Sequence, residues 1–407
     1  MTCSCVNRLG LTKIIPPSFI VAGNVLGVGL LALPIKLGVS GCLPSVLDIL
    51  IICAAMVVSA LVIAERLPSD KKIFDIPSFF EQEIGVSGRW IAIVCNLIIL
   101  YGIIIAYLSG ISSIIYSLLP FHVPHSLITI LYFLFATSLV IFGKGVMRRS
   151  SVIIMPAIWI CFAILIFSGS AHFDVNLLHY SNWSYVPLGL PVVISAFHFH
   201  NVIPTVSNCV DHNLKSLRKV IFIGVGIGLI MNLIWVVTVL GTLSHASIID
   251  AFVSGTPATV PMSLLLGSKL FTTAGLIFAA LAVTASYMAN GSGLLGFIRD
   301  LLYTHFRVEN KAVAVFIAFI PALIFALIYP HIFLAALDIV GGIGEAMLFA
   351  VLPGLILMRM MRNRHKIIFG FSARILHKIG LAVFLIGVFV MLFVGVEKLN
   401  LLHIIPK

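Results

Sequence analysis

The sequence predicts an all-α integral membrane protein with about eleven transmembrane helices. The first observation behind this prediction is composition. Of 407 residues, 61% are hydrophobic and only 10% are charged, and the mean hydropathy is +1.19. A soluble domain carries about 25% charged residues. Because this chain has too few charges to cover a water-exposed surface, we expect most of it to lie in a lipid bilayer.

The second observation is a series of apolar runs, each close to the roughly 20 residues that cross the hydrocarbon core as a helix. Lipid offers no partner to backbone amides and carbonyls, so continuous runs of this length indicate helices rather than barrel strands. The predicted spans are residues 14–35, 42–64, 90–119, 126–143, 150–169, 183–209, 220–243, 270–298, 312–329, 331–358 and 378–396.

The third observation is the placement of positive charge. With the N-terminus inside, all but four of the 25 lysine and arginine residues fall in inner loops or at inner helix ends, the exceptions being Lys36, Lys269, Lys398 and Lys407. This asymmetry predicts a cytoplasmic N-terminus, an external C-terminus and an odd number of spans. It also accounts for the net charge of +11, so we expect no nucleic acid partner.

The first span carries glycines at its middle. Residues 23–34 read GNVLGVGLLALP, and each glycine inside a helix costs roughly 0.5–1 kcal/mol relative to alanine. We therefore expect this helix to be interrupted at Gly27–Gly29. The alternative is that the glycines only allow a neighbouring helix to pack closely.

The sixth span predicts a second interruption, because residues 192–205 read VVISAFHFHNVIPT. Pro204 lacks a backbone donor and disfavours helix at the residue before it. We expect a break near Phe197–Pro204, with a simple kink as the alternative.

Two interrupted spans that lie five spans apart are the pattern of an inverted five-plus-five repeat. On this interpretation residues 1–407 form a single membrane transporter domain. The first repeat would occupy residues 14–169 and the second residues 183–358. Residues 378–396 would then be an extra C-terminal helix.

Interrupted helices in the middle of a membrane predict a binding site. Backbone amides at the start of a half-helix attract a carboxylate, and freed carbonyls attract a cation. A zwitterionic amino acid supplies both groups. We expect the amides of Gly27, Val28 and Gly29 to hold a substrate carboxylate.

Four stretches resemble a known family. GNVLGVGLLALP resembles the first-helix signature of the amino acid–polyamine–organocation transporters, and is closest to the aromatic amino acid permeases, the bacterial tyrosine and tryptophan proton symporters. AYLSGISS (106–113), FHFHNVIP (197–204) and ASYMANGSGLLGFIRDLL (285–302) resemble the third, sixth and eighth helices of that family. His198 and Asn201 stand where glycines are usual in it, so they add bulk and hydrogen-bonding groups to the expected pocket.

The resemblance implies a LeuT-like fold with discontinuous helices 1 and 6, and a secondary active transporter that imports tyrosine and/or tryptophan by proton symport with alternating access. It also implies a multi-pass protein of the bacterial inner membrane with no cofactor. The implied partners are the aromatic amino acid, a proton and the lipid bilayer, with no protein partner evident.

The residues expected to bind substrate lie around the two interruptions and in the third span: Asn24, Gly27, Val28, Gly29, Tyr107, Phe197, His198, Phe199, His200 and Asn201. Each has a plain structural alternative. His200 could bridge the broken backbone as a hydrogen-bonding group, and Tyr107 could be an ordinary core residue. No histidine or cysteine has partners at metal-ligand spacing, so we expect no metal site.

The candidates for proton coupling are Glu345, His200 and Asp338. Carboxylates inside a membrane are costly and face the protein interior or water, and histidine titrates near physiological pH. Asp338 and Glu345 are seven residues apart and would share one face of a regular α-helix. Glu345 could instead be a paired structural carboxyl. Asp338 could serve gating, or be solvated near the outer end.

Proton coupling is favoured over sodium coupling by what the resemblance places beside the first interruption. Sodium-coupled transporters of this fold carry hydroxyl oxygens there in the eighth helix, where an ungapped comparison puts Ala282 and Val283, with Thr284 just beyond. Hard cations need oxygen ligands. A sodium-coupled or exchange permease for another neutral amino acid stays open as an alternative. A membrane-embedded enzyme is a remote one, because no nucleophile with a base and no metal set stands at a recognisable spacing.

Overall fold

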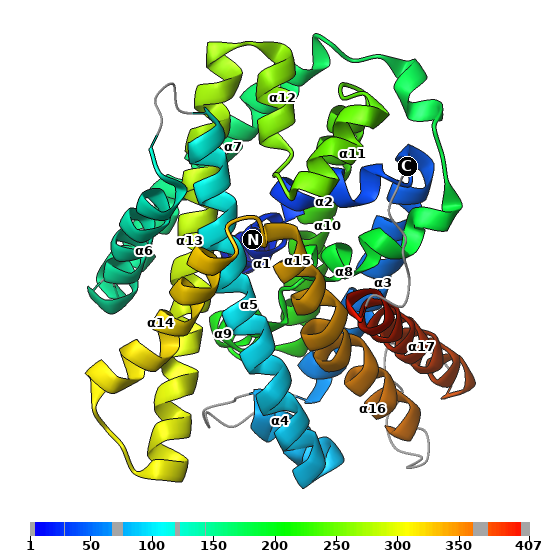
Figure 1. The fold of residues 1–407 in the computed structure, drawn as a ribbon. Coiled ribbons are helices and arrows are strands. Elements are labelled where there is room, and N and C mark those ends of the chain that lie inside the picture. The colour runs from blue at the N-terminus through cyan, green and yellow to red at the C-terminus, as the bar shows by residue number, and fades with distance from the viewer. Residues whose placement is uncertain are drawn as a thin grey trace.

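A computed structural model of the chain describes residues 5–27, 29–66, 76–118, 123–142, 144–360 and 373–399. Throughout these residues the regular secondary structure is helical, apart from one isolated bridge between Gly41 and Ser181 (Figure 1). The prediction of an all-α protein is therefore confirmed for the part of the chain that the structure describes.

The helices follow the predicted apolar runs closely. Up to the middle of the chain they are α1 (Cys5–Leu26), α2 (Gly29–Gly38), α3 (Cys42–Arg66), α4 (Ile76–Ile84), α5 (Val86–Leu118), α6 (His125–Phe142), α7 (Lys144–Ser170), α8 (Val186–Ala196), α9 (Ile203–Cys209) and α10 (Leu214–Leu240). They continue with α11 (His245–Ser254), α12 (Thr259–Leu266), α13 (Lys269–Leu301), α14 (Lys311–Ile328), α15 (Phe333–Ile339), α16 (Leu352–Met360) and α17 (Ala373–Lys398).

The described helices are those of a multi-pass membrane protein. Nine of them, counted with their continuations, are long and apolar enough to cross a bilayer. The bent pair Lys13–Leu26 and Leu31–Gly38 brings the number to ten if it is one span. A shorter apolar helix, Pro156–Ser170, falls in the fifth predicted span.

The two ends of the helix bundle differ (Figure 1). The short helices α11 and α12 cover the upper end, whereas α4 and the connection from α13 to α14 lie at the lower end. Arg307 and Lys311 belong to that lower connection, and Arg66 pairs with Glu83 of α4 at 3.6 Å. The lower end therefore carries basic side chains next to the lower helix ends.

Both predicted interruptions are confirmed. α1 ends at Leu26 and α2 begins at Gly29, and the axes of the two halves differ by 48°. α8 ends at Ala196 and α9 begins at Ile203, with Pro204 in the first turn of α9, where a missing N–H costs nothing. The chain thus leaves the helical path at the glycines and before the proline, as their local chemistry requires.

The half-helices pair in a consistent way. α1 packs against α9, and α2 packs against α8. In the α2–α8 contact, a Cβ on Gly189 would lie only 2.4 Å from a methyl of Leu37, so glycine brings these two half-helices close together. Because each half of the first helix contacts one half of the other, the two interruptions lie at a similar depth in the bundle.

The tenth predicted span is not a regular α-helix. Between α15 and α16 the chain forms two π-helical segments, Val340–Glu345 and Met347–Val351. The π-helical geometry changes the angular spacing of side chains, so the regular α-helix from which a shared face of Asp338 and Glu345 was expected is not formed here. π-Helical turns occur frequently at functional sites.

Candidate functional site

The first interruption is stabilised by side chains from two other helices. Asn232 of α10 donates from Nδ2 to the Val25 carbonyl at 3.4 Å, which supplies a partner to one of the carbonyls that the end of α1 leaves free. On the other side, a Cβ added to Gly27 would lie 2.7 Å from Oγ of Ser286 in α13. Glycine at this position therefore lets the Ser286 side chain of α13 come close to the break, and a larger residue would have to displace that hydroxyl.

The polar groups predicted beside the interruptions have different surroundings. Val28 lies outside the described residues. Gly29 begins α2, so its amide is among the first N–H groups of that half-helix, which have no partner within the helix. Asn24 donates to the Ile20 carbonyl of its own helix at 3.1 Å. Asn201 has a buried amide oxygen without a hydrogen bond partner, so its amide is a free polar group at the second break.

The second interruption is lined by buried rings. Phe197 and Phe199 leave the helical conformation, with φ/ψ of −98°/27° and −128°/5°, and both side chains are fully buried. His198 and His200 are also buried. The four residues thus form a closed wall inside the protein, instead of the lipid-facing surface that an apolar helix would present.

Phe349, from the second π-helical segment, completes this wall. Its ring lies parallel to that of His200, with centroids 4.2 Å apart and planes 11° apart, and it also stacks on His198 at 5.2 Å. Phe199 stacks on His200 at 4.9 Å. Both ring nitrogens of His200 are buried without a hydrogen bond partner, although the ring lies beside the backbone of Met56. Nothing in the sequence distinguishes Phe349 from the other phenylalanines, of which the chain has 29 in all.

Glu345 lies next to His198 at the bottom of this site. The distance from His198 Nδ1 to Glu345 Oε1 is 2.8 Å, and the Glu345 side chain has no exposed surface. The contact is short enough for an ion pair, but neither carboxylate oxygen has a partner with hydrogen-bond geometry among the described residues. The structure thus brings together two residues that lie far apart in the sequence.

Tyr107 of α5 belongs to a group of hydroxyls between α5, α6 and α13. It is buried, and its hydroxyl lies beside Ser286 and Asn290 of α13. Two further hydroxyl pairs continue the group, Tyr132–Thr284 at 3.1 Å and Thr137–Tyr287 at 2.8 Å. Ser286 joins this group to Gly27, so the first interruption has a hydroxyl neighbour that the ungapped comparison of α13 did not predict.

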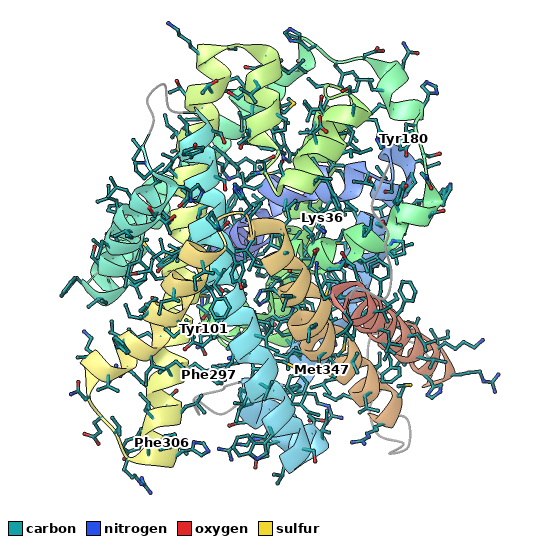
Figure 2. All side chains as sticks on the ribbon, viewed as in Figure 1. Lys36, Tyr101, Tyr180, Phe297, Phe306 and Met347 are labelled. Carbon is teal, nitrogen blue, oxygen red and sulfur yellow. The ribbon has the colours of Figure 1, made fainter. Side chains whose placement is uncertain are left out.

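Asp338 lies apart from these groups and has two lysine partners. Its Oδ2 is 2.8 Å from Nζ of Lys36 in α2 and 3.0 Å from Nζ of Lys398 in α17. The Lys36 and Asp338 side chains are only 4% and 2% exposed, and Lys36 also lies over the ring of Phe252 in α11. Figure 2 shows Lys36 in the upper half of the molecule and Met347, two residues from Glu345, in the lower half.

Taken together, five buried rings gather at the second interruption and are called the ring cluster below: Phe197, His198, Phe199, His200 and Phe349. The carboxylate of Glu345 lies beside this cluster. Among the described residues there is no group of three histidine, cysteine or acidic side chains that could hold a metal ion. The ring cluster offers stacking partners to an aromatic ring, and its histidines and the carboxylate offer partners to polar groups.

Comparison with known proteins gives a consistent match over nearly the whole chain. The tryptophan/tyrosine permease family matches residues 11–394. The Tyrosine-specific transport system 1 of Haemophilus influenzae is 29% identical over 340 residues, which cover 81% of this chain and 84% of that protein. The Low affinity tryptophan permease of Escherichia coli (strain K12) is 24% identical over 344 residues, 80% of this chain and 81% of that protein. Glutamine transporter 2 of Aliivibrio fischeri is 24% identical over 342 residues, which cover 81% of this chain and 84% of that protein.

Proposed function

Since the chain belongs to the tryptophan/tyrosine permease family, we propose that it imports tyrosine and/or tryptophan by proton symport with alternating access. The observation that carries this proposal is the buried ring cluster at the second of the two helix interruptions. A membrane-embedded enzyme is set aside, because the family and the relatives are permeases and transport proteins.

In the proposed binding mode, main-chain groups hold the charged end of the substrate and rings hold its side chain. The amides of residues 27–29 receive the carboxylate, since α2 starts there with unpaired N–H groups. The aromatic ring of the substrate lies among Phe197, Phe199 and Phe349. Aromatic pairs contribute about 0.5–1.5 kcal/mol beyond the burial of their area, which favours aromatic over aliphatic substrates.

We infer that the transport cycle uses the inverted five-plus-five architecture with eleven spans. Support comes from the paired half-helices: α1 and α9 on one side of the interruptions, α2 and α8 on the other. In such folds the two sides open in turn around a fixed site. The repeats are residues 14–169 and 183–358, with residues 378–396 as an added helix.

The ion pairs suggest which side opens more easily. On the side of α2, the Lys36–Asp338 pair is buried. On the side of α1, Lys13 pairs with Asp211 just after α9 at 2.9 Å, but both side chains are more than half exposed. Exposed pairs contribute little, whereas separating a buried pair is costly. We propose that the Lys36–Asp338 ion pair holds the outer side closed. This role for Asp338 is an alternative to its role in proton coupling.

We place the protein in the inner membrane of a bacterium, with the lower end of Figure 1 in the cytoplasm. The cytoplasmic N-terminus and external C-terminus follow from the excess of lysine and arginine at inner helix ends. The basic connection from α13 to α14, seen at the lower end, supports this orientation.

A sodium-coupled or exchange permease for another neutral amino acid is the second candidate. It is favoured by two observations: the Ser286 hydroxyl next to the first interruption, and the relative from Aliivibrio fischeri, whose name gives glutamine as its substrate. Hard cations bind oxygen ligands, so one hydroxyl at the break is a possible part of a sodium site.

Uptake into proteoliposomes separates the two candidates. Labelled tyrosine, tryptophan and glutamine are each supplied under an imposed pH gradient and then under a sodium gradient. We expect the pH gradient to drive accumulation of tyrosine or tryptophan, and the sodium gradient alone to drive none. Accumulation with sodium alone, or preference for glutamine, would contradict the proposal in favour of the second candidate.

A further inference from the structure

We propose that His198 and Glu345 form a single proton-binding site, and that this pair carries the proton through the transport cycle. The inference rests on the proposed function, because it names the carrier within a proton symporter. It departs from the prediction from the sequence, in which Glu345 and His200 are separate candidates. The observation behind it is the 2.8 Å contact between His198 Nδ1 and Glu345 Oε1 in a fully buried setting.

The net charge of the His198–Glu345 pair depends on whether the pair holds a proton. Neither oxygen of Glu345 has a hydrogen bond partner among the described residues, and an isolated buried carboxylate is very costly. With one shared proton, the pair is neutral overall, whether the proton is on the carboxyl or on the imidazole. Without a proton the pair carries one buried negative charge. One shared proton therefore removes the net charge of the buried pair.

The groups around the pair leave no other described charge to balance Glu345. From α5, Tyr107 presents a neutral hydroxyl that is already beside Ser286 and Asn290. From the second interruption, His200 faces His198. Among the described residues, no side chain besides His198 lies within ion-pair distance of Glu345.

The other acidic and basic groups on the neighbouring elements are more distant or already paired. Asp338, in the same span, has its own two lysines, Lys36 and Lys398, and the latter also contacts Glu397 at 3.5 Å. On α3, which packs against the second π-helical segment, Asp48 lies in the first two turns, at the outer end. Among the described residues no other charge is placed to neutralise Glu345, so we expect its charge to be balanced by a proton that binds to the pair and leaves it during the cycle.

Two features of the fold bring the pair together. Gly341 packs so closely on α8 that a Cβ there would lie 1.8 Å from the Pro191 carbonyl. This contact fixes the π-helical segment against the half-helix that ends just before His198. The interruption after Ala196 then frees the His198 side chain from a helical direction and lets it turn toward Glu345.

The pair also adjoins the ring cluster that is proposed to hold the substrate ring. His198 stacks on Phe349, which stacks on His200. A substrate ring that enters this stack must shift Phe349 or His198, and so changes the distance within the pair. Protonation and substrate binding then affect each other by the same free energy, as linkage requires. One proton enters from outside water with the substrate, and it leaves when inner water reaches the pair.

The test compares Glu345→Gln and His198→Gln with the matched controls Glu309→Gln and His305→Gln, whose side chains are exposed in the connection from α13 to α14. Two activities are measured in proteoliposomes: accumulation of labelled tyrosine under a gradient of about one pH unit, and exchange of labelled for unlabelled tyrosine. A pH-sensitive dye reports protons moved with tyrosine. One pH unit supports about tenfold accumulation at one proton per substrate.

We expect both variants of the pair to lose accumulation, from about tenfold to none, together with the tyrosine-dependent proton signal. Glu345→Gln should keep exchange, because glutamine imitates the protonated carboxyl. The controls should behave like the unaltered protein. Glu345→Asp, which retains a shorter carboxyl, is the second variant if glutamine prevents folding, and it should keep accumulation with a shifted pH profile.

Three results would overturn the assignment: unchanged accumulation in Glu345→Gln or His198→Gln, loss of exchange in folded Glu345→Gln, or an unshifted pH profile in Glu345→Asp. Failure of the proposed function looks different. In that case the unaltered protein itself shows no accumulation under a pH gradient, and no tyrosine-dependent proton movement.

Discussion

The buried contact of Asp338 with two lysines predicts an asymmetry between two substitutions. Lys36→Met removes one cation, but Asp338 keeps Lys398 at 3.0 Å. Asp338→Asn removes the only carboxylate within reach of Lys36 among the described residues, and the Lys36 side chain is 4% exposed. After Asp338→Asn, the Lys36 ammonium group still lies over the Phe252 ring, whose centroid is 4.6 Å from Nζ.

The magnitudes follow from burial. Removing one partner of a buried ion pair costs about 3–5 kcal/mol, because the other charge is left uncompensated. Losing a single charged hydrogen bond while another partner stays costs about 1.5–3 kcal/mol. We therefore expect Asp338→Asn to destabilise the state whose outer side is closed by about 1–2 kcal/mol more than Lys36→Met does. This difference corresponds to a factor of roughly 5–30 in the population that is open to the outside.

The assay measures how often the outer side opens. Ser40 follows α2 and is 1% exposed, so a cysteine at this position is protected while the outer side is closed. In a chain whose seven cysteines are replaced, Ser40→Cys is labelled with an impermeant maleimide. The labelling rate is proportional to the open fraction when opening is fast relative to labelling. Asp338→Asn should raise this rate more than Lys36→Met.

A double substitution provides the control for Lys398. Lys36→Met together with Lys398→Met leaves Asp338 without a cation, so the combined effect should exceed the sum of the single effects. If Lys36→Met raises labelling as much as Asp338→Asn, or if the two lysine substitutions are additive, then Lys398 does not stabilise Asp338 and the reasoning is wrong.

Three further predictions concern the interruptions and the inner side. Gly27→Ala should weaken tyrosine binding by about 1–3 kcal/mol, roughly 5–150-fold, because its methyl would overlap the Ser286 hydroxyl, and Ser286→Ala should restore much of this loss in an equilibrium binding assay. Phe349→Ala should raise the KM for tyrosine about 2–12-fold through loss of an aromatic partner, with an unchanged KM counting against the proposed pocket. Lys13 lowers the pKa of Asp211, so their pair stabilises the fold above the ordinary carboxyl pKa and is lost as pH falls through the lowered one. Lys13→Gln should remove this part of the pH dependence of thermal unfolding and leave transport at neutral pH in high salt unchanged.

The features that the sequence predicted correctly are those that depend on residues close together in the chain. Apolar runs give spans because a helix satisfies its own backbone within lipid. The interruptions at Gly27 and before Pro204 were predictable for the same reason: glycine and proline act on the backbone at their own positions. The family resemblance rested on these two segments and on residues 106–113 and 285–302, and it is confirmed over residues 11–394.

The partners across the fold could not be predicted, because they depend on how the helices pack. Lys36 and Asp338 are 302 residues apart. The sequence indicated Lys36 only as one of four outer lysines and Asp338 as a candidate for proton coupling or gating, with nothing to join the two. An ungapped comparison placed Ala282 and Val283 beside the first break, whereas the structure places Ser286 next to Gly27. The π-helical segment that ends at Glu345 and the contact of Glu345 with His198 were likewise not predicted.

The central claim is that main-chain groups at the first interruption hold the carboxylate of an aromatic amino acid. The most direct measurement is an experimental structure of the protein with saturating tyrosine. We predict the substrate carboxylate at about 2.7–3.2 Å from backbone nitrogens of residues 27–29, with its ring among Phe197, Phe199 and Phe349. A carboxylate bound by side chains alone, or a tyrosine ring away from these three residues, would contradict the claim.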